Sequence, residues 1–255
     1  MKRLFLCTNF LLILISLACH IHNPFSKQNS RSAEDYKNSG TAKAKQGDLD
    51  GAIADLNKAI EIDASYAPAY NNRGLARKDK GDMDGAIADF SKAIEIDPRD
   101  AVAYYNRGLT RQDKGDSEGA ITDYNKAIEI DPSEADYYYN RGVLRQDKND
   151  LDGAIADYSR AIEINPRLAF AYNNRGNSWK DKGNLDSAIN DYNKVIEIDP
   201  QATKAYLNRG MALLREGKDA EAQRDFDRFL VLDPSSKPVL DKKVAEVKRE
   251  RAVQR

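Results

Sequence analysis

Small and apolar residues recur at helical spacing in two segments of residues 67–100, one on each side of the polar sequence Lys80-Gly81-Asp82. The first segment carries Tyr70, Gly74 and Arg77, and the second carries Ala86, Phe90, Ala93 and Ile94. Asp97-Pro98 follows, and a proline placed there ends a helix because it lacks an N–H and disfavours a helical residue before it. The pattern predicts an antiparallel pair of helices joined by a tight turn.

The same pattern recurs along most of the chain. Pro98, Pro132, Pro166, Pro200 and Pro234 are each 34 residues apart. A fixed period of this length indicates a solenoid, whose units bury their apolar faces against their neighbours. We predict six units, at residues 33–66, 67–100, 101–134, 135–168, 169–202 and 203–236. In residues 237–255 an apolar stripe of Val239, Leu240, Val244 and Val247 predicts a helix that caps the sixth unit.

Glycine recurs at two positions of the unit. Where the first helix must end, the chain has Gly47, Gly81, Gly115, Gly183 and Gly217, with Asn149 in the fourth unit. Asparagine tolerates the left-handed conformation that ends a helix, so the same turn is predicted throughout. Within the first helix the chain has Gly40, Gly74, Gly108, Gly142, Gly176 and Gly210, each costing about 1 kcal/mol of helix propensity. We expect them to face Ala52, Ala86, Ala120, Ala154, Ala188 and Ala222, so that the two helices approach closely.

Composition narrows the possible functions. The 40 basic and 41 acidic residues give a net charge of -1, which argues against a nucleic-acid-binding protein driven by bulk charge. The only cysteines and histidines, Cys7, Cys19, His20 and His22, precede the repeats. A disulfide framework or a histidine-dependent catalytic site is therefore not expected within the repeats, and we expect no cofactor, no metal and no enzymatic activity. Cys19, His20 and His22 are residue types that bind metal ions, but they lie in a segment predicted to be flexible, which makes a poor metal site.

The first eighteen residues have the form of a signal peptide. Lys2 and Arg3 precede an apolar run that ends at Ala18 and is too short to span a membrane. Ser16-Leu17-Ala18-Cys19 resembles a bacterial lipobox, which implies lipidation of Cys19 and a membrane-anchored lipoprotein in the cell envelope. Small residues at Ser16 and Ala18 also fit ordinary signal cleavage, which would leave a secreted or periplasmic protein. Residues 19–32 are polar and predict a flexible tether.

Two rows of opposite charge run through the units. The basic row is Arg73, Arg107, Arg141, Arg175 and Arg209, and the acidic row is Asp55, Asp89, Asp123, Asp157, Asp191 and Asp225. A guanidinium can fork onto a carboxylate, so these rows predict repeated salt bridges between helices. We expect each aspartate to pair with the arginine of the next unit, which leaves Asp225 over. The functional alternative is an anion-binding row.

The spacing Tyr-x-x-x-Gly, then Ala-x-x-x-Tyr/Phe-x-x-Ala, then Pro, repeated every 34 residues from 33 to 236, resembles the tetratricopeptide repeat. The resemblance implies an all-α protein, a right-handed α-α superhelix of six helix-turn-helix repeats. Its first helices would line a concave groove for an extended peptide or a partner protein. Ala64 stands in place of proline in the first unit, where an end unit can deviate.

One asparagine per unit defines a candidate binding row, Asn38, Asn72, Asn106, Asn140, Asn174 and Asn208. This position resembles the asparagine ladder that faces the groove in superhelical repeat proteins, where an amide could bond a peptide backbone. The alternative is that these asparagines bind nothing and recur only because the sequence Asn-Arg-Gly was copied when the repeats were duplicated. Other positions that the family places on the inner face hold Leu75, Tyr105, Leu109, Tyr139, Val143, Phe170 and Asn177.

These patterns predict a non-catalytic scaffold in the bacterial cell envelope. We expect a monomeric solenoid that holds a partner segment in its groove and binds membrane only through its N-terminal lipid. Two alternatives stay open: an envelope or pilus assembly factor, either pilotin-like or an outer-membrane biogenesis lipoprotein, and a regulatory subunit of an envelope enzyme.

Overall fold

The computed structural model describes residues 31–253, which form pairs of α-helices without strands. The predicted signal peptide, Cys19 and most of the predicted tether lie outside this range. The first helices of the pairs are α2 (Ala33–Lys45), α4 (Ala67–Asp79), α6 (Ala101–Asp113), α8 (Ala135–Asp147), α10 (Ala169–Asp181) and α12 (Thr203–Arg215). The second helices are α3 (Leu49–Ile62), α5 (Met83–Ile96), α7 (Ser117–Ile130), α9 (Leu151–Ile164), α11 (Leu185–Ile198) and α13 (Asp219–Leu232). A 3-10 turn, η1 (Pro234–Ser236), leads into α14 (Lys237–Val253).

The turn inside each pair has the conformation that the sequence predicts. The five glycines that follow the first helices have φ between 81° and 90°, and Asn149 has φ 61°. One residue later, Asp82 accepts a hydrogen bond from the backbone N–H of Gly85 and so begins the second helix. Asp48, Asp116, Asp150 and Asn184 do the same in their units. The turn residues therefore both end one helix and start the next.

The glycines within the first helices face large side chains, so the expectation of a facing alanine is wrong. A Cβ built on Gly74 would lie 2.7 Å from Cε1 of Phe90, and one built on Gly108 would lie 2.7 Å from Cε1 of Tyr124. Both rings are completely buried. Only at Gly40 is the alanine itself close, through the backbone oxygen of Ala52. The missing side chain makes room for an aromatic ring, and the buried alanines pack elsewhere in the same interface.

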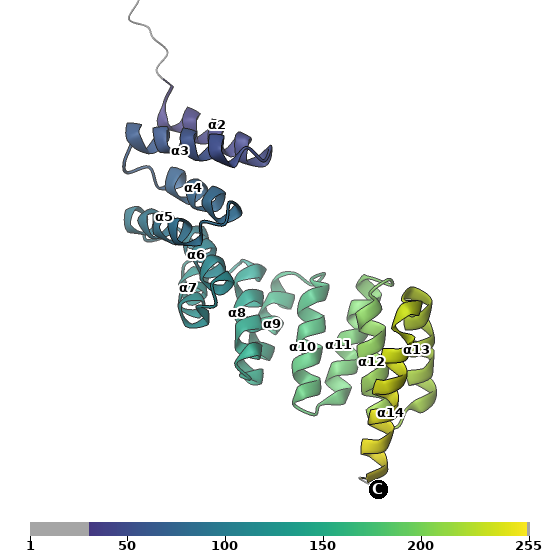
Figure 1. Ribbon diagram of the computed structural model, residues 1–255. Helices are drawn as coiled ribbons and strands as arrows, with labels where there is room; N and C mark the ends of the chain where they lie inside the picture. Colours follow the sequence, from purple (N-terminus) through teal and green to yellow (C-terminus); the bar gives the residue numbers. More distant parts are fainter. Residues whose placement is uncertain (1–30, 254–255) are drawn as a thin grey trace, which may run out of the picture.

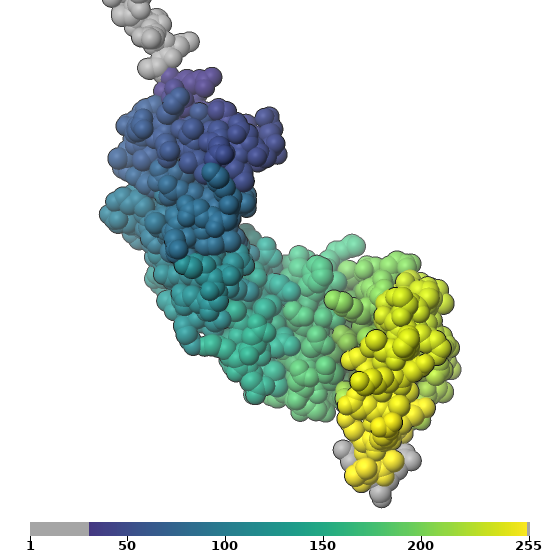
Figure 2. Space-filling view, in the orientation of Figure 1, coloured from purple at the N-terminus to yellow at the C-terminus, as the bar shows by residue number. Residues whose placement is uncertain are grey.

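The units stack into a curved array (Figure 1). Each second helix packs against the first helix of its own unit, and those of units one to five also pack against the first helix of the next unit. First helices of successive units also approach one another, as α2 with α4 and α10 with α12 do, whereas successive second helices lie farther apart. The array therefore bends toward its first helices, and Figure 2 shows the hollowed side between the N-terminal units and α14. None of the described helices is long and apolar enough to cross a membrane.

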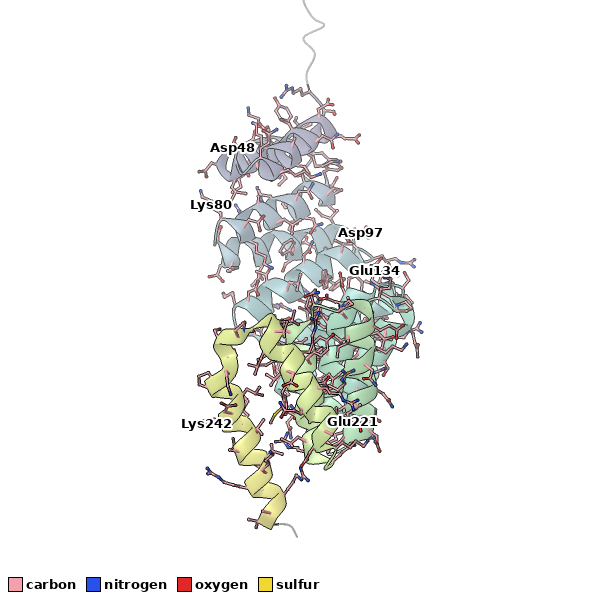
Figure 3. All side chains as sticks on the ribbon, turned by 90° about the vertical axis from the view of Figure 1, so that its right-hand side faces the viewer. Asp48, Lys80, Asp97, Glu134, Glu221 and Lys242 are labelled. Carbon is pink, nitrogen blue, oxygen red and sulfur yellow. The ribbon has the colours of Figure 1, made fainter. Side chains whose placement is uncertain are left out.

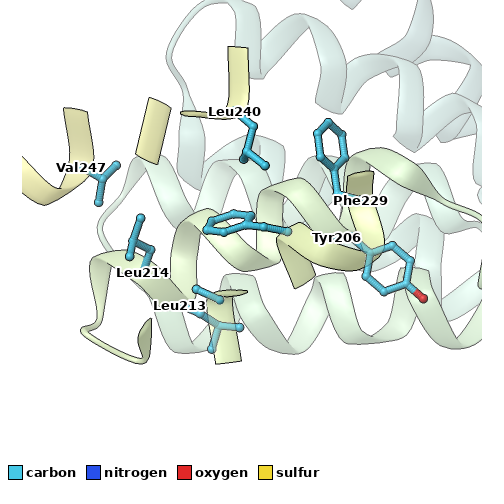
Figure 4. Close-up of a cluster of buried hydrophobic side chains, with 8 residues drawn as sticks. Tyr206, Leu213, Leu214, Phe229, Leu240 and Val247 are labelled. Carbon is cyan, nitrogen blue, oxygen red and sulfur yellow. The ribbon is translucent and has the colours of Figure 1, made fainter. Parts of the chain in front are cut away.

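The last helix caps the array, as predicted. Leu240 and Val247 of α14 are 4% and 2% exposed and join a cluster with Leu214, Phe226 and Phe229 (Figure 4). Val244 is partly buried against the same cluster. Val239, which the sequence placed on the buried stripe, is 57% exposed, because it lies about 100° around the helix from Leu240 and so outside the face that Leu240, Val244 and Val247 share. The cap covers the apolar face that α12 and α13 would otherwise expose to water.

Candidate binding groove

Arginine-aspartate pairs fix the two helices of units two to six against one another. Nε and Nη2 of Arg107 donate to the two carboxylate oxygens of Asp123 at 3.0 and 2.7 Å, and Arg111 adds a bond of 2.8 Å. Asp123 is 1% exposed, and a buried carboxylate is tolerated only with such partners. The prediction of repeated salt bridges is confirmed, and these arginines are engaged inside the fold instead of forming an open row for an anion.

The predicted register of those pairs is wrong. Arg73 bonds Asp89, Arg107 bonds Asp123, Arg141 bonds Asp157, Arg175 bonds Asp191 and Arg209 bonds Asp225, always within one unit. The aspartate left over is Asp55, because Ser39 stands where its arginine would be. Asp55 instead accepts from Ser39 Oγ at 2.7 Å and pairs with Lys43 at 2.6 Å. Neighbouring units are joined by other pairs, such as that of Lys80, which Figure 3 labels, with Asp50.

The asparagine row forms a seam between successive first helices. The amide nitrogen of Asn106 donates to Asn71 Oδ1 at 3.1 Å, and that of Asn140 donates to the hydroxyl of Tyr105 at 3.0 Å. The remaining links, each from one unit back to the preceding unit, are Asn72 to Thr41, Asn174 to Tyr139, and Asn208 to Asn173 and Asn177. Asn38 is exposed and accepts from Lys37 within its own helix. Except at Asn38, an amide N–H is thus used to join units. Asn106 is buried, at 8% exposed, and Oδ1 of Asn174 accepts from Asn173 at 3.2 Å, so the row serves first to hold successive first helices together.

Tyrosines occupy the middle of this seam. The ring of Tyr105 packs on Tyr124 and Tyr137, with centroids 5.8 and 4.8 Å away, and Tyr139 packs on Tyr158 at 5.9 Å. Burial, followed by the negative charge of Asp136, raises the pKa of Tyr105 to about 12. Burial also raises the pKa of Tyr139. Both hydroxyls therefore keep their protons at neutral pH and can donate while accepting from the seam.

The other groove positions differ in how much side chain they present. Leu75 is 38% exposed and Phe170 is 72% exposed, while Leu109 and Val143 are half-buried. Asn177 is occupied within the fold, because its Oδ1 accepts from Tyr192 at 2.8 Å as well as from the seam. Val102, at the position of unit three equivalent to Phe170, is 49% exposed, so the exposed apolar surface of the first helices is provided mainly by Leu75, Val102 and Phe170.

A cavity of about 230 Å³ lies at the C-terminal end of the groove, where α14 meets α12. Leu207 and Met211, which occupy groove positions on α12, line it together with Val247 of α14. Basic side chains reach it from three helices, Lys180 of α10, Arg215 of α12 and Lys243 of α14.

Sequence reasoning missed this cavity because it treated α14 only as a cap. The residue that ends the first helix is Asp79, Asp113, Asp147 and Asp181 in units two to five, and the change to Arg215 in unit six was a signal available in the sequence. Within residues 31–253, no group of three or more His, Cys, Asp or Glu side chains is arranged to hold a metal ion.

Comparison with known families decides what kind of repeat this is. Models of the tetratricopeptide repeat match residues 40–81, 74–115 and 111–148, then 135–168 and 169–201, and finally 204–236. The chain belongs to the tetratricopeptide-repeat family. None of these matching models describes an enzyme, and a search of curated protein sequences gave no match.

Solved tetratricopeptide structures share this architecture. A crystal structure of MamA is 30% identical, with a TM-score of 0.63 over 68% of this chain and 94% of its own. YrrB, described as having an unusual peptide-binding site, is 24% identical, with a TM-score of 0.67 over 76% of this chain and 97% of its own. PilF of Pseudomonas aeruginosa is 18% identical, with a TM-score of 0.70 over 86% of this chain and 97% of its own. The likeness to YrrB and PilF is one of fold.

Proposed function

We propose that this tetratricopeptide chain is an interaction scaffold that binds an extended segment of a partner protein along its first helices. The observation that supports this most directly is a contrast within the repeated unit. Positions that build the fold stay nearly constant, as the glycine under the aromatic ring and the arginine-aspartate pair do. Positions facing the groove change from unit to unit although the fold around them is the same.

Two groove positions carry most of this variation in units two to six. The residue before the seam asparagine is Asn71, Tyr105, Tyr139, Asn173 and Leu207 in turn. The residue after the helix glycine is Leu75, Leu109, Val143, Asn177 and Met211. A run of amide, aromatic and aliphatic groups suits a segment whose backbone bonds the amides and whose apolar side chains lie in between.

A photo-crosslinking amino acid tests the groove in native envelopes. It would be placed at Leu75 on the groove and, as a matched control, at Ile62, an exposed apolar residue of the second helix α3. We expect a discrete crosslinked product at Leu75 that Phe170→Ser reduces, and none at Ile62. Equal products at the two positions, or products at Leu75 that Phe170→Ser leaves unchanged, would contradict the proposal.

We also propose that the scaffold is exported and held at a membrane of the cell envelope by lipid on Cys19. The support is the sequence itself, a basic start and a short apolar run that end directly before this cysteine. Cells fed a labelled fatty acid should label the wild type and Cys7→Ser equally, and should not label Cys19→Ser. Label that persists in Cys19→Ser would refute the anchor and favour ordinary cleavage after Ala18.

The two alternative roles have no separate support among the described residues. The likeness to PilF is one of fold and assigns no assembly function. A regulatory subunit of an enzyme would use the same groove, so the crosslinked partner distinguishes it from an assembly factor. We propose a monomer, which light scattering of the purified chain would test.

A further inference from the structure

Charge is distributed unevenly between the repeats and the helix that caps them. Residues 33–236 have 29 basic and 38 acidic side chains, which give a net charge of -9. Residues 237–255 have 7 basic and 3 acidic side chains, which give a net charge of +4. The chain therefore combines an acidic array with a basic C-terminal end, and such an asymmetry is typical of a segment that binds a negatively charged partner.

Much of the basic charge of α14 has no partner inside the described part of the chain. Within residues 31–253 this helix makes three ion pairs, which are Lys237 with Asp241, Arg251 with Asp219, and Glu250 with Arg215. Two of its three acidic residues are therefore already paired. The charged residues of α14 outside these pairs are all exposed, and they are Lys242, Lys243, Glu246, Lys248 and Arg249. Four basic groups and one acidic group leave three positive charges for an external partner.

The outer face of α14 gathers several of these cations. Successive residues of an α-helix are about 100° apart, so Lys242, Arg249 and Val253 lie about 180° to 220° around the helix from Leu240. Leu240 is buried against the array, and Lys242 is labelled on this helix in Figure 3. Val239 and Val253, near the two ends of α14, are 57% and 87% exposed. The side of α14 opposite the array is thus a row of cations with an apolar residue near each end.

Two cations of the array extend this basic surface. Arg215 of α12 and Lys180 of α10 line the cavity of about 230 Å³ beside α14, together with Lys243. Arg215 stands where units two to five have aspartate, and it lies 3.9 Å from Glu250, near the limit of an ion pair. Lys180 lies 3.3 Å from Asp181, which is half exposed. The positive charge therefore extends from α14 to α12 and α10, and exposed pairs of this kind neutralise little of it.

The shape of this end favours a flat partner. The C-terminal turns of α14 project past the ends of the other helices, and α14 forms a ridge on the outside of the array (Figures 1 and 2). The two cavities that border α14 reach Lys243 and Lys248 but neither Lys242 nor Arg249. A convex row of cations matches a flat surface of repeated negative charges, such as the headgroups of anionic phospholipids. The same surface repels the acidic array, so contact is restricted to this end.

We propose that the outer face of α14 binds the surface of an anionic phospholipid membrane, with Lys242, Lys243 and Arg249 among the headgroups. The binding is peripheral and electrostatic, because the apolar face of α14 is already used to cap unit six. It orients the molecule with α14 toward the membrane and the acidic units away from it. The proposal does not depend on the peptide groove. It differs from the expectation that only an N-terminal lipid binds membrane, and two such weak contacts together hold a protein more firmly than one.

Vesicle sedimentation tests this surface in the absence of the lipid. The chain from residue 19, with Cys19→Ser, contains every residue that the structure describes. We expect it to sediment with phosphatidylcholine vesicles that contain about 30% phosphatidylglycerol at about 50 mM salt, and to be released at about 500 mM salt, where charges are screened over a shorter distance. It should not sediment with phosphatidylcholine alone. Equal binding to the two kinds of vesicle, or no binding to the anionic ones, would overturn the proposal.

Paired charge reversals identify the face that binds. Lys242→Glu/Arg249→Glu should weaken binding to the anionic vesicles at least tenfold, because each cation near such a surface contributes about fivefold. The matched control is Lys92→Glu/Lys126→Glu, which changes the net charge equally but on exposed lysines of α5 and α7, and it should weaken binding less than about twofold. Glu246→Gln should strengthen binding. Equal losses in the two double variants would show that binding follows net charge alone and would refute a specific face.

The competing partner for a basic helix is the acidic array of a second copy. In that case sedimentation equilibrium would show a dimer at low salt that Lys242→Glu/Arg249→Glu dissociates, and the anionic vesicles would bind no protein. That result would overturn the membrane proposal. Amide hydrogen exchange gives the position of the contact directly. Anionic vesicles should slow exchange in α14 and leave α3 and α5 unchanged, whereas slowing confined to the N-terminal helices would contradict the proposed orientation.

Discussion

Removing one arginine of a buried pair should cost very different amounts in two units that otherwise match. Arg107 and Arg175 each fork onto a buried aspartate, Asp123 and Asp191, with contacts of 2.7 to 3.0 Å. Each also donates to a serine of the preceding unit, at 3.0 and 2.9 Å, and each lies over a tyrosine ring, at 5.6 and 5.5 Å. The contacts of the two arginines are therefore nearly the same.

The difference lies one turn farther along the first helix. Arg111 gives Asp123 a second cation at 2.8 Å, whereas the equivalent position in unit five is Trp179, which packs against apolar residues. Arg175→Met thus leaves Asp191 buried without a cation, which costs about 3 to 5 kcal/mol. Arg107→Met leaves Asp123 paired with Arg111 and forfeits charged hydrogen bonds worth about 1.5 to 3 kcal/mol.

Urea unfolding of both variants, followed by far-UV circular dichroism, measures the difference. Because a repeat array can unfold in steps, the fluorescence of Trp179, the only tryptophan, serves as a local probe of unit five. Arg160→Met, on an exposed arginine paired with Glu163, is the control and should cost under about 0.5 kcal/mol. The double variant Arg175→Met/Asp191→Leu should recover most of the loss. Equal costs for Arg107→Met and Arg175→Met would refute the reasoning.

Three further results are expected. Gly108→Ala, whose methyl would lie 2.7 Å from the buried ring of Tyr124, should lower the free energy of unfolding by about 1 to 3 kcal/mol in thermal melts. Burial raises the pKa of Tyr105 from 10.0 to about 12, so its contribution to stability is complete below pH 10 and is lost as the pH rises toward 12. The free energy of unfolding should therefore be lower at pH 11 than at pH 9. A phenol titration curve that Tyr105→Phe leaves unchanged would contradict this expectation. Burial raises the pKa of Asp55, but the hydrogen bonds from Lys43 and Ser39 outweigh burial, so the net pKa is lowered. Lys43→Met should therefore lower the free energy of unfolding at pH 6, and the difference from the wild type should shrink as the pH falls below about 4.

The fold was predictable because the residues that make it act locally. Gly81 ends one helix, Asp82 begins the next and Pro98 ends that one, and each effect depends on backbone chemistry within a few residues. Because the same residue types recur at the same positions of successive units, Ala64 and Asn149 could be recognised as substitutions at known positions. Contacts between helices were harder to predict from the sequence. Gly74 was expected to face Ala86, but it lies under the ring of Phe90.

Partners in a periodic chain are ambiguous for a geometrical reason. Arg73 precedes Asp89 by 16 residues and follows Asp55 by 18, and both spacings recur at each of the five arginines of the row. Periodicity alone cannot choose between them, and only the packing of the helix pair shows that the partner lies in the same unit. The seam has the same ambiguity, because an amide such as Asn106 could face a ligand or the preceding helix, and the structure joins its N–H to Asn71.

The C-terminal end of the array explains why the cavity residues had to come from the structure. Within the array, a change at a groove position alters what the surface presents but disturbs only adjacent units. At the last unit α12 has no following unit, and the capping helix supplies Val247 and Lys243 to the cavity beside α12. A site built from a break in the repeat is invisible to reasoning from the repeat. The residues most informative about function are therefore those that depart from the period, Arg215 in place of aspartate and the tyrosines in place of asparagine.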